Sequence, residues 1–252
     1  GSDLDLVFIY DMPSQTETDG RKPVANSVFF TRLGQRIINY LNTVTAAGQL
    51  FEVDMRLRPD GAKGLLVSTL AAFTQYQLYE AWTWEHQALV RARPIAGSNK
   101  LSTDFIEVRK QVLCQVRQQA DLKQEVIDMR EKMRQQLASK PDADGLTTQF
   151  HLKHDEGGIV DIEFMVQYGV LAHAHRCQKL LTYTDNIRIL EGFEIQGILT
   201  VSQAHDLREA YQTMRAVEHR LTLQNQAGEV STDDLREQRQ KVKAIWAAMM
   251  CS

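Results

Sequence analysis

The chain has 252 residues, of which 43% are hydrophobic and 24% charged, and its formal net charge is −3. This length allows one large domain or two of ordinary size, and the composition is that of a globular protein rather than a disordered or fibrous one. The slightly negative charge argues against a nucleic-acid binder with a broad basic surface. No apolar run approaches the roughly 20 residues that span a bilayer. Three widely separated cysteines without a CxxC pair favour reduced thiols in a cytoplasmic protein.

The first predicted strand lies in GSDLDLVFIYD and carries two aspartates at its start. Side chains alternate between the two faces of a strand, so Asp3 and Asp5 point the same way. The segment from Leu6 to Tyr10 is apolar, and we expect it to be buried on both faces. Two like charges side by side repel each other unless a cation or a shared proton relieves them. The pattern therefore leaves two interpretations, a solvated strand end or a divalent-metal site made from paired carboxylates.

The next segments predict a helix, a hairpin and a second helix. In VANSVFFTRLGQRIINYLN (residues 24–42), apolar residues recur at helical spacing. The segment GQLFEVDMRLRP (residues 48–59) alternates apolar and polar residues, which predicts a half-buried strand. A short strand over residues 65–68 would pair with it as a hairpin. A long, largely buried helix is predicted over residues 69–93.

From about residue 98 the sequence changes to helices joined by short loops. Apolar residues recur in steps of three and four between Leu122 and Leu137, which is typical of packing in a helical bundle. We therefore predict an α+β protein dominated by helices. A partial mixed sheet with helices would occupy residues 1–97, and an α-helical bundle would occupy residues 98–252.

A third carboxylate, Asp54, lies on the polar face of the strand predicted over residues 48–59. If this strand lies beside the first one, its carboxylate joins the first pair. Three aspartates in this arrangement can hold two divalent ions, and Mg²⁺ prefers carboxylates together with substrate phosphates. Arg56 and Arg58 share the face with Asp54 and would clamp phosphates. Alternatively, these arginines only neutralise the acidic residues of the same strand face.

The order of several motifs resembles a known family. SDLDL, a helix and then VDMRLRP resemble the nucleotidyltransferase superfamily of the DNA polymerase β type. FEVDMRLRPDGAKGLLV, EAWTWEHQALVRAR, MREKMR and DEGGIVDIEF together resemble the C-terminal adenylylating half of the bifunctional glutamine synthetase adenylyltransferase/adenylyl-removing enzymes. The resemblance extends over essentially the whole chain. The removing half typically has GGIREIEF, where Val160 and Asp161 stand here, so the sequence favours the adenylylating half.

This resemblance implies a reaction and its partners. AMP would pass from ATP to a tyrosine hydroxyl of glutamine synthetase, with release of pyrophosphate, in the bacterial cytoplasm. Asp3 and Asp5 would be the metal-binding pair of a two-ion Mg²⁺ site. Asp54 would be the third carboxylate and the base that draws the proton from the tyrosine. The family is controlled by PII-type signal proteins and by glutamine, and the bundle would take part in docking.

The superfamily also places a Gly-rich turn before the aspartates, where backbone N–H groups hold the triphosphate. This chain starts at the aspartates, so we expect a piece of the enzyme that lacks the turn and has weak or no activity by itself. Two alternatives remain open. One is the adenylyl-removing activity, which uses phosphate to release ADP, and the other is a non-catalytic docking or regulatory module.

Four further residues are expected to contact phosphate, nucleotide or substrate. Arg91 and Arg93 would share a face if the chain is extended there. Lys153 and Glu163 lie in the signature KHDEGGIVDIEF, which the resemblance marks as a family motif. Its glycines, Gly157 and Gly158, would start a helix whose free N–H groups favour anions. A plain helix start is the alternative interpretation.

Two other features favour structural interpretations. Glu85 lies in an apolar stretch of helix, where an unpaired charge is costly, and we expect it to pair with an arginine. Two histidine pairs, at 151 and 154 and at 173 and 175, lack the second cysteine or carboxylate that would complete a recognisable zinc site.

Overall fold

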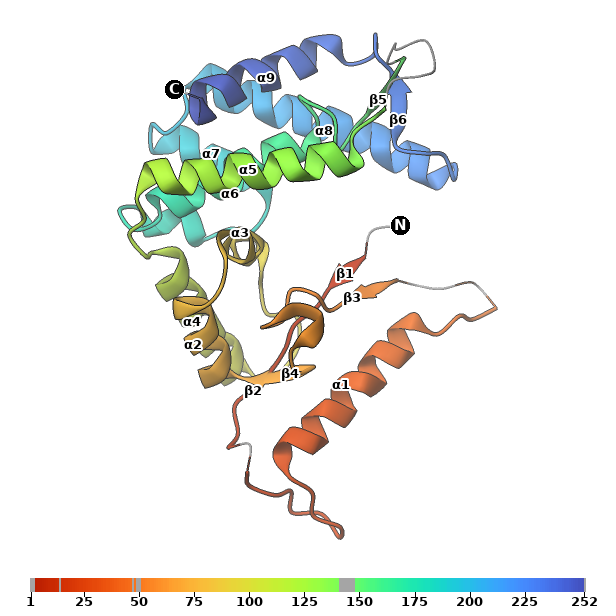
Figure 1. The fold of residues 1–252 in the computed structure, drawn as a ribbon, viewed down its shortest axis with the longest axis vertical. Helices are drawn as coiled ribbons and strands as arrows, with labels where there is room; N and C mark the ends of the chain where they lie inside the picture. Colours follow the sequence, from red (N-terminus) through yellow and green to blue (C-terminus); the bar gives the residue numbers. More distant parts are fainter. Residues whose placement is uncertain (1–2, 14, 47, 49–50, 141–147, 252) are drawn as a thin grey trace. The chain divides into compact units, whose positions relative to one another are not determined.

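The computed structural model describes residues 3–13, 15–46, 48, 51–140 and 148–251, so the expectations for residues 1–2, 49–50 and 141–147 lie outside it. The predicted α+β class with predominant helices is confirmed. The chain forms two compact units, Gly1–Glu85 with Pro94–Val112 and His86–Arg93 with Leu113–Ser252. Figure 1 shows their elements. The domain boundary after residue 97 stays a prediction.

The strands of the first unit form two parallel pairs. β1 (Leu4–Asp5) pairs with β3 (Val53–Asp54), and β2 (Phe8–Tyr10) pairs with β4 (Val67–Thr69). The predicted hairpin is therefore wrong, because β4 joins a strand far away in the sequence. The strand predicted over residues 48–59 was also too long, since turns follow directly after β3.

The apolar segment after Asp5 is less buried than its composition suggested. Between Leu6 and Tyr10 only Tyr10 is buried, and the strand is interrupted between β1 and β2. The predicted first helix is confirmed as α1 (Asn26–Asn42). Gly34 lets α1 approach the β2–β4 pair, because a Cβ there would lie 3.2 Å from Phe8 Cδ2.

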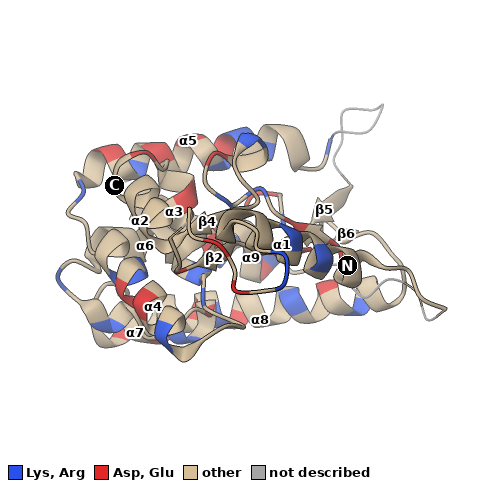
Figure 2. Cartoon of the chain, turned by 90° about the horizontal axis from the view of Figure 1, so that it is seen from below, with Lys and Arg blue, Asp and Glu red and all other residues tan. Residues whose placement is uncertain are grey.

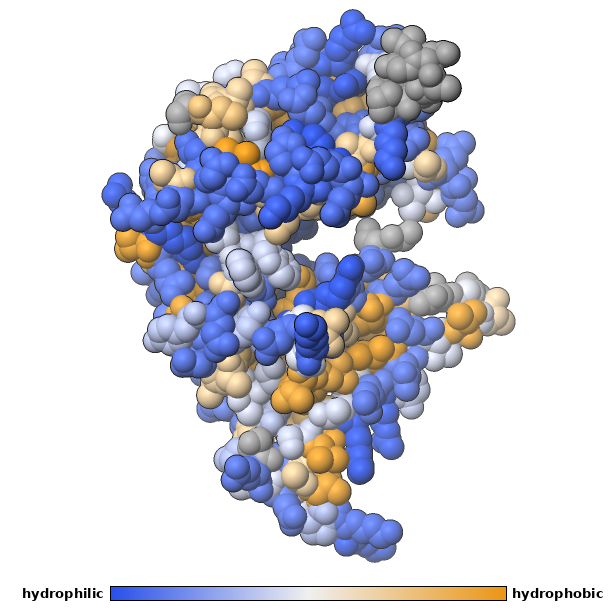
Figure 3. All heavy atoms as spheres, in the orientation of Figure 1, coloured by the Kyte–Doolittle hydropathy of each residue, from blue (hydrophilic) through white to orange (hydrophobic). Residues whose placement is uncertain are grey.

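Apolar side chains remain exposed on the outer side of α1. Phe29 and Leu33 are exposed, and so is Leu65 just before β4. In the space-filling view, hydrophobic residues gather around α1 and β4 (Figure 3). The apolar spacing thus predicted the helix correctly but did not show which of its apolar residues the unit covers.

The long helix predicted over residues 69–93 is two helices, α2 (Leu70–Tyr79) and α3 (Thr83–Arg91). The break between them is set by Glu85, whose carboxylate accepts the backbone N–H of Trp82 at 2.9 Å and the Tyr76 hydroxyl at 2.9 Å. A glutamate at the third helical position that bonds back to the cap residue is a helix-start signal, which apolar spacing does not reveal. α4 (Asn99–Leu113) follows.

The second unit is a helical bundle built around α6 (Ile159–His173), which is buried along most of its length. It packs against α5 (Gln119–Leu137), α7 (Asn186–Ile195), α8 (Val201–Leu223) and α9 (Arg236–Met250), as Figure 1 shows. β5 (Gln149–His151) and β6 (Glu229–Ser231) form an antiparallel pair. α6 and α7 approach closely at Gly169, where a Cβ would lie 2.5 Å from the Phe193 ring.

Charged residues are mixed in sign along the surface helices. Acidic and basic residues alternate along α5 and α8 rather than forming one basic face (Figure 2). Within the described residues, none of the helices combines the length and the apolar character that crossing a membrane requires.

Candidate functional site

The β1–β3 pair brings the predicted carboxylates to one face. Asp5 and Asp54 are in register, and the Leu4 and Leu6 N–H groups donate to Glu52 O at 2.7 Å and Asp54 O at 2.9 Å. Neighbours across a strand pair point to the same face, and Asp3 follows Asp5 by alternation. The backbone therefore directs all three predicted aspartates to the same side of the pair.

A cavity of about 490 Å³ opens beside this face. It is lined by Asp3, Asn42, Glu52, Val53, Asp54 and Arg56. Sequence reasoning missed Glu52 and Asn42 as members of the site. Glu52 was detectable, since it alternates in phase with Asp54, whereas Asn42 arrives from the end of α1 and had no local signal.

Arg56 holds the Asp54 carboxylate on both oxygens. Its backbone N–H donates to Oδ1 at 2.8 Å and its Nε–H to Oδ2 at 2.7 Å, and Nη2 lies 2.5 Å from Oδ2. The hydrogen bond from Arg56 is the main reason why the pKa of Asp54 lies below its usual value. That same bond raises the pKa of Arg56, and the negative charges of Asp3 and Asp5 raise it further. The Arg56 guanidinium therefore binds Asp54 directly and lies within the electrostatic influence of Asp3 and Asp5.

The donor chemistry of this face fits a divalent cation. Carboxylate oxygens are the ligands that Mg²⁺ prefers, and a positive charge already lies among them. In the part of the chain that the structure describes, however, no three His, Cys, Asp or Glu residues lie close enough together to hold a metal ion. This also applies to the two histidine pairs. The Mg²⁺ site thus remains a proposal about Asp3, Asp5 and Asp54.

Arg58 supports the turn after β3 rather than extending a strand face. Its guanidinium donates to Met55 O at 2.7 Å, Ala62 O at 3.1 Å and Gly64 O at 3.3 Å. All three acceptors are backbone carbonyls, so this side chain is used to close the loop. A role of Arg58 in phosphate binding stays a prediction.

In the second unit, the structure brings together two of the predicted residues, Arg91 and Glu163. Arg91 Nη1 lies 2.8 Å from Glu163 Oε1. The same oxygen also accepts Asn186 Nδ2 at 3.4 Å and the Tyr211 hydroxyl at 3.3 Å. Burial and the Glu163 charge raise the pKa of Tyr211. Asn186 and Tyr211 come from α7 and α8, and nothing in the local sequence marks them.

The other two predicted contact residues of this unit, Lys153 and Arg93, have different surroundings. Lys153 Nζ lies 2.9 Å from Glu218 Oε1, and Arg215 holds the other oxygen of Glu218 at 2.6 Å. Arg93 is exposed just beyond the end of α3. In the first unit, the arginine partner expected for Glu85 is replaced by the Tyr76 hydroxyl and the Trp82 backbone. Burial, followed by the hydrogen bond to Glu85, raises the pKa of Tyr76 to about 12.

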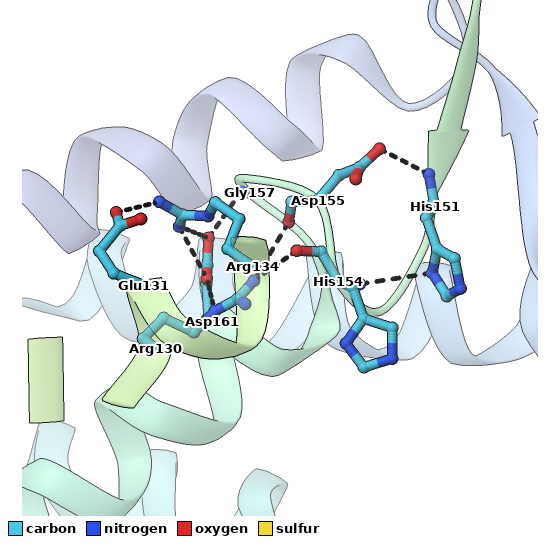
Figure 4. Close-up of polar contacts among 8 residues, drawn as sticks. All are labelled: Arg130, Glu131, Arg134, His151, His154, Asp155, Gly157 and Asp161. Atoms are coloured by element: carbon cyan, nitrogen blue, oxygen red, sulfur yellow. Dashed lines mark hydrogen bonds and ion pairs between the residues drawn. The ribbon is translucent and has the colours of Figure 1, made fainter. Parts of the chain in front are cut away.

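The signature at the start of α6 contains Asp161, which forms a buried ion pair with Arg130 of α5 (Figure 4). Asp161 accepts Arg130 Nε at 2.5 Å and the Gly157 N–H at 2.7 Å, and Arg134 Nη2 lies 3.3 Å away. Arg130 also donates to His154 O at 2.8 Å. Asp161 thus takes up the Gly157 N–H group that a bound anion would need, which favours the interpretation of this motif as a helix start.

Comparison with known proteins then identifies the family. The family described as glutamate-ammonia ligase adenylyltransferase matches residues 1–108, and the family described as GlnD PII-uridylyltransferase matches residues 127–249. Three bifunctional glutamine synthetase adenylyltransferase/adenylyl-removing enzymes are similar over almost the whole chain. The protein from Pseudomonas syringae is 55% identical over 99% of this chain, that from Hahella chejuensis 52% over 98%, and that from Pseudomonas aeruginosa 53% over 98%.

The alignments cover 26% of each of these relatives, so the chain spans about a quarter of their length. The identity is high and extends through both compact units. The chain belongs to the family of bifunctional glutamine synthetase adenylyltransferase/adenylyl-removing enzymes.

Proposed function

We propose that the protein transfers AMP from ATP to a tyrosine hydroxyl of glutamine synthetase and releases pyrophosphate. The names of the relatives support the reaction class and the protein substrate. The observation that carries the proposal for this chain is the register of Asp5 with Asp54, which directs these two carboxylates and that of Asp3 to one face of the β1–β3 pair, where Asp3 and Asp54 line a cavity. Nucleotidyl transfer needs such an arrangement to manage phosphate charge.

In the proposed reaction the tyrosine oxygen attacks the α-phosphorus of ATP. A new O–P bond forms, the bond from the α-phosphorus to the bridging oxygen breaks, and pyrophosphate leaves with that electron pair. Asp3, Asp5 and Asp54 would hold Mg²⁺, which neutralises phosphate charge and lowers the pKa of the attacking hydroxyl. The tyrosine proton passes to Asp54, which is a weak base while Arg56 holds it.

The remaining predicted contacts are part of the same proposal. Arg56 reaches the cavity and is exposed enough to meet a phosphate. Arg91, Arg93, Lys153 and Glu163 of the second unit are proposed contacts of nucleotide or protein substrate. Regulation by PII-type proteins and by glutamine is proposed too, and the match of residues 127–249 to a PII-uridylyltransferase family supports the first. We place the protein in the cytoplasm.

The relatives are also named as adenylyl-removing enzymes, so phosphorolysis of adenylyl-tyrosine is the second candidate. Val160 and Asp161 stand where the removing half typically has Arg and Glu, and this favours the adenylylating half. A non-catalytic docking or regulatory module is the third.

The test is transfer of labelled AMP from ATP to glutamine synthetase with Mg²⁺. It compares the 252-residue chain, a version extended upstream to include a Gly-rich turn, and the extended version with Asp3→Asn or Asp54→Asn. Labelling by the extended protein that both substitutions abolish supports the proposal. An extended protein that is inert with ATP but releases ADP from adenylylated glutamine synthetase supports the second candidate, and inertness in both assays supports the docking module.

A further inference from the structure

Arg56 and Asp54 form an ion pair, and Asp54 is one of the carboxylates proposed to bind a divalent cation. Both carboxylate oxygens of Asp54 are used, one by the backbone N–H and the other by the guanidinium of the same residue. Because the Arg56 guanidinium is bonded to Oδ2, a metal ion cannot bind Asp54 from that side of the carboxylate while the pair is formed.

The charges around Arg56 show that it serves more than one carboxylate. Asp3, Asp5 and Asp54 all act on its guanidinium, and Glu52 lines the same cavity. Four acidic side chains near one positive charge leave an excess of negative charge. A divalent cation satisfies that excess better than a monovalent guanidinium does.

The ion pair between Arg56 and Asp54 is also weak enough for a competing cation to break it. The Arg56 side chain is 78% exposed and that of Asp54 only 14%. An ion pair with one partner in water is weak, because solvent replaces the lost contacts. In the described part of the chain, no three acidic, histidine or cysteine residues are spaced to hold a metal ion.

We propose that the Arg56 guanidinium and a divalent cation exclude each other at Asp54, so that cation binding requires Arg56 to swing away from the carboxylate. The inference rests on the proposed function, since it concerns the same carboxylates. It assigns Arg56 a role that sets the affinity for the cation. Arg56 acts as the counter-ion of Asp54 and is released when a divalent cation binds the carboxylate.

The test is a calorimetric titration of the 252-residue chain with Mg²⁺. Arg56→Gln should bind Mg²⁺ about twofold to fivefold more tightly than the unchanged chain, since its competitor is gone. Arg36→Gln is the matched control, because Arg36 is an exposed arginine of α1 in the same unit and the change removes the same charge. It should leave the affinity unchanged. Asp54→Asn should weaken binding strongly.

A second measurement separates exclusion from a simple change of charge. The NMR resonance of the Arg56 Nε–H group, assigned by its loss in Arg56→Gln, reports the bond to Asp54. It should move to the position of a free arginine as Mg²⁺ saturates the chain, and it should already be there in Asp54→Asn. Arg56→Lys keeps the charge but loses the forked donors of the guanidinium. Its affinity for Mg²⁺ should lie between that of the unchanged chain and that of Arg56→Gln.

The outcomes are distinguishable. If Asp54→Asn binds Mg²⁺ as well as the unchanged chain, the metal site of the proposed function is wrong. If Asp54→Asn loses binding while Arg56→Gln behaves like Arg36→Gln, the metal site stands and the exclusion is overturned. An Arg56 resonance that stays in place at saturating Mg²⁺ also overturns it, whatever the affinities are.

Discussion

Asp161 and Arg130 form an ion pair at 2.5 Å in which each side chain is only 1% exposed. Charges at such depth are costly unless they are paired and hydrogen-bonded. Asp161 is bonded further by the Gly157 N–H, and Arg130 by the His154 carbonyl. The pair therefore ties α5 to the loop that starts the central helix of the second unit.

Asp161→Asn should destabilise the chain by about 3–5 kcal/mol, because it leaves the Arg130 charge buried without a counter-ion. Urea unfolding followed by circular dichroism measures this. Asp233→Asn, which breaks the exposed pair with Arg236, is the matched control and should leave the midpoint unchanged. Replacing both buried partners, as Arg130→Met with Asp161→Leu, should cost less than Asp161→Asn alone. A single substitution that is harmless would contradict this account of the pair.

The helix of the α6 signature was predictable from sequence, but this pair was not. Apolar spacing and the glycines before α6 place the helix start, whereas Arg130 lies on another helix, 31 residues away from Asp161 in sequence. The same limit applies to Glu163. Its partners Asn186 and Tyr211 come from two further helices, and only tertiary packing brings them together.

The strands were the harder part of the fold. The alternation over residues 48–59 predicts a strand, yet only Val53–Asp54 is one, because Arg58 closes a turn on backbone carbonyls directly afterwards. A hairpin was expected since it is the most local pairing. Parallel pairing joins segments with a helix between them, and composition does not specify that choice.

His154 should make the stability of the chain depend on pH. Burial, helped by the positive charges of His151, Arg130 and Lys153 and opposed by Asp155, lowers its pKa from 6.5 to about 4. Between these values the unfolded chain binds more protons than the folded one. Stability therefore falls as the pH is lowered from about 6.5 toward 4.

His154→Gln should flatten this slope, which urea midpoints between pH 7.5 and 4.5 would show. His205→Gln is the control, because His205 is an exposed residue of α8. It should leave the slope unchanged. An equal slope in the His154→Gln chain and the unchanged chain would show that other groups cause the pH dependence.

Gly169 is required for the contact of α6 with α7. Alanine favours helices by about 1 kcal/mol over glycine, but its Cβ would lie 2.5 Å from the buried Phe193 ring and 3.2 Å from Met249 Cε. Gly169→Ala should therefore destabilise the chain by about 1–3 kcal/mol in urea unfolding. Adding Phe193→Leu should recover part of that loss, since it removes the ring that is struck. No recovery in the double variant would place the clash elsewhere.

The pair of Arg91 and Glu163 tests whether two predicted site residues support the fold or remain available to a ligand. Their side chains are 43% and 22% exposed, so the direct coupling between them should be small, about 0.2–1 kcal/mol. A double-mutant cycle of Arg91→Met and Glu163→Gln in urea unfolding measures it. Glu163→Gln alone should cost more than Arg91→Met alone, because the Glu163 carboxylate also accepts from Asn186 and Tyr211. A coupling energy well above 1 kcal/mol would make this a structural pair, and Arg91 would then be a poor choice for the phosphate contact proposed above.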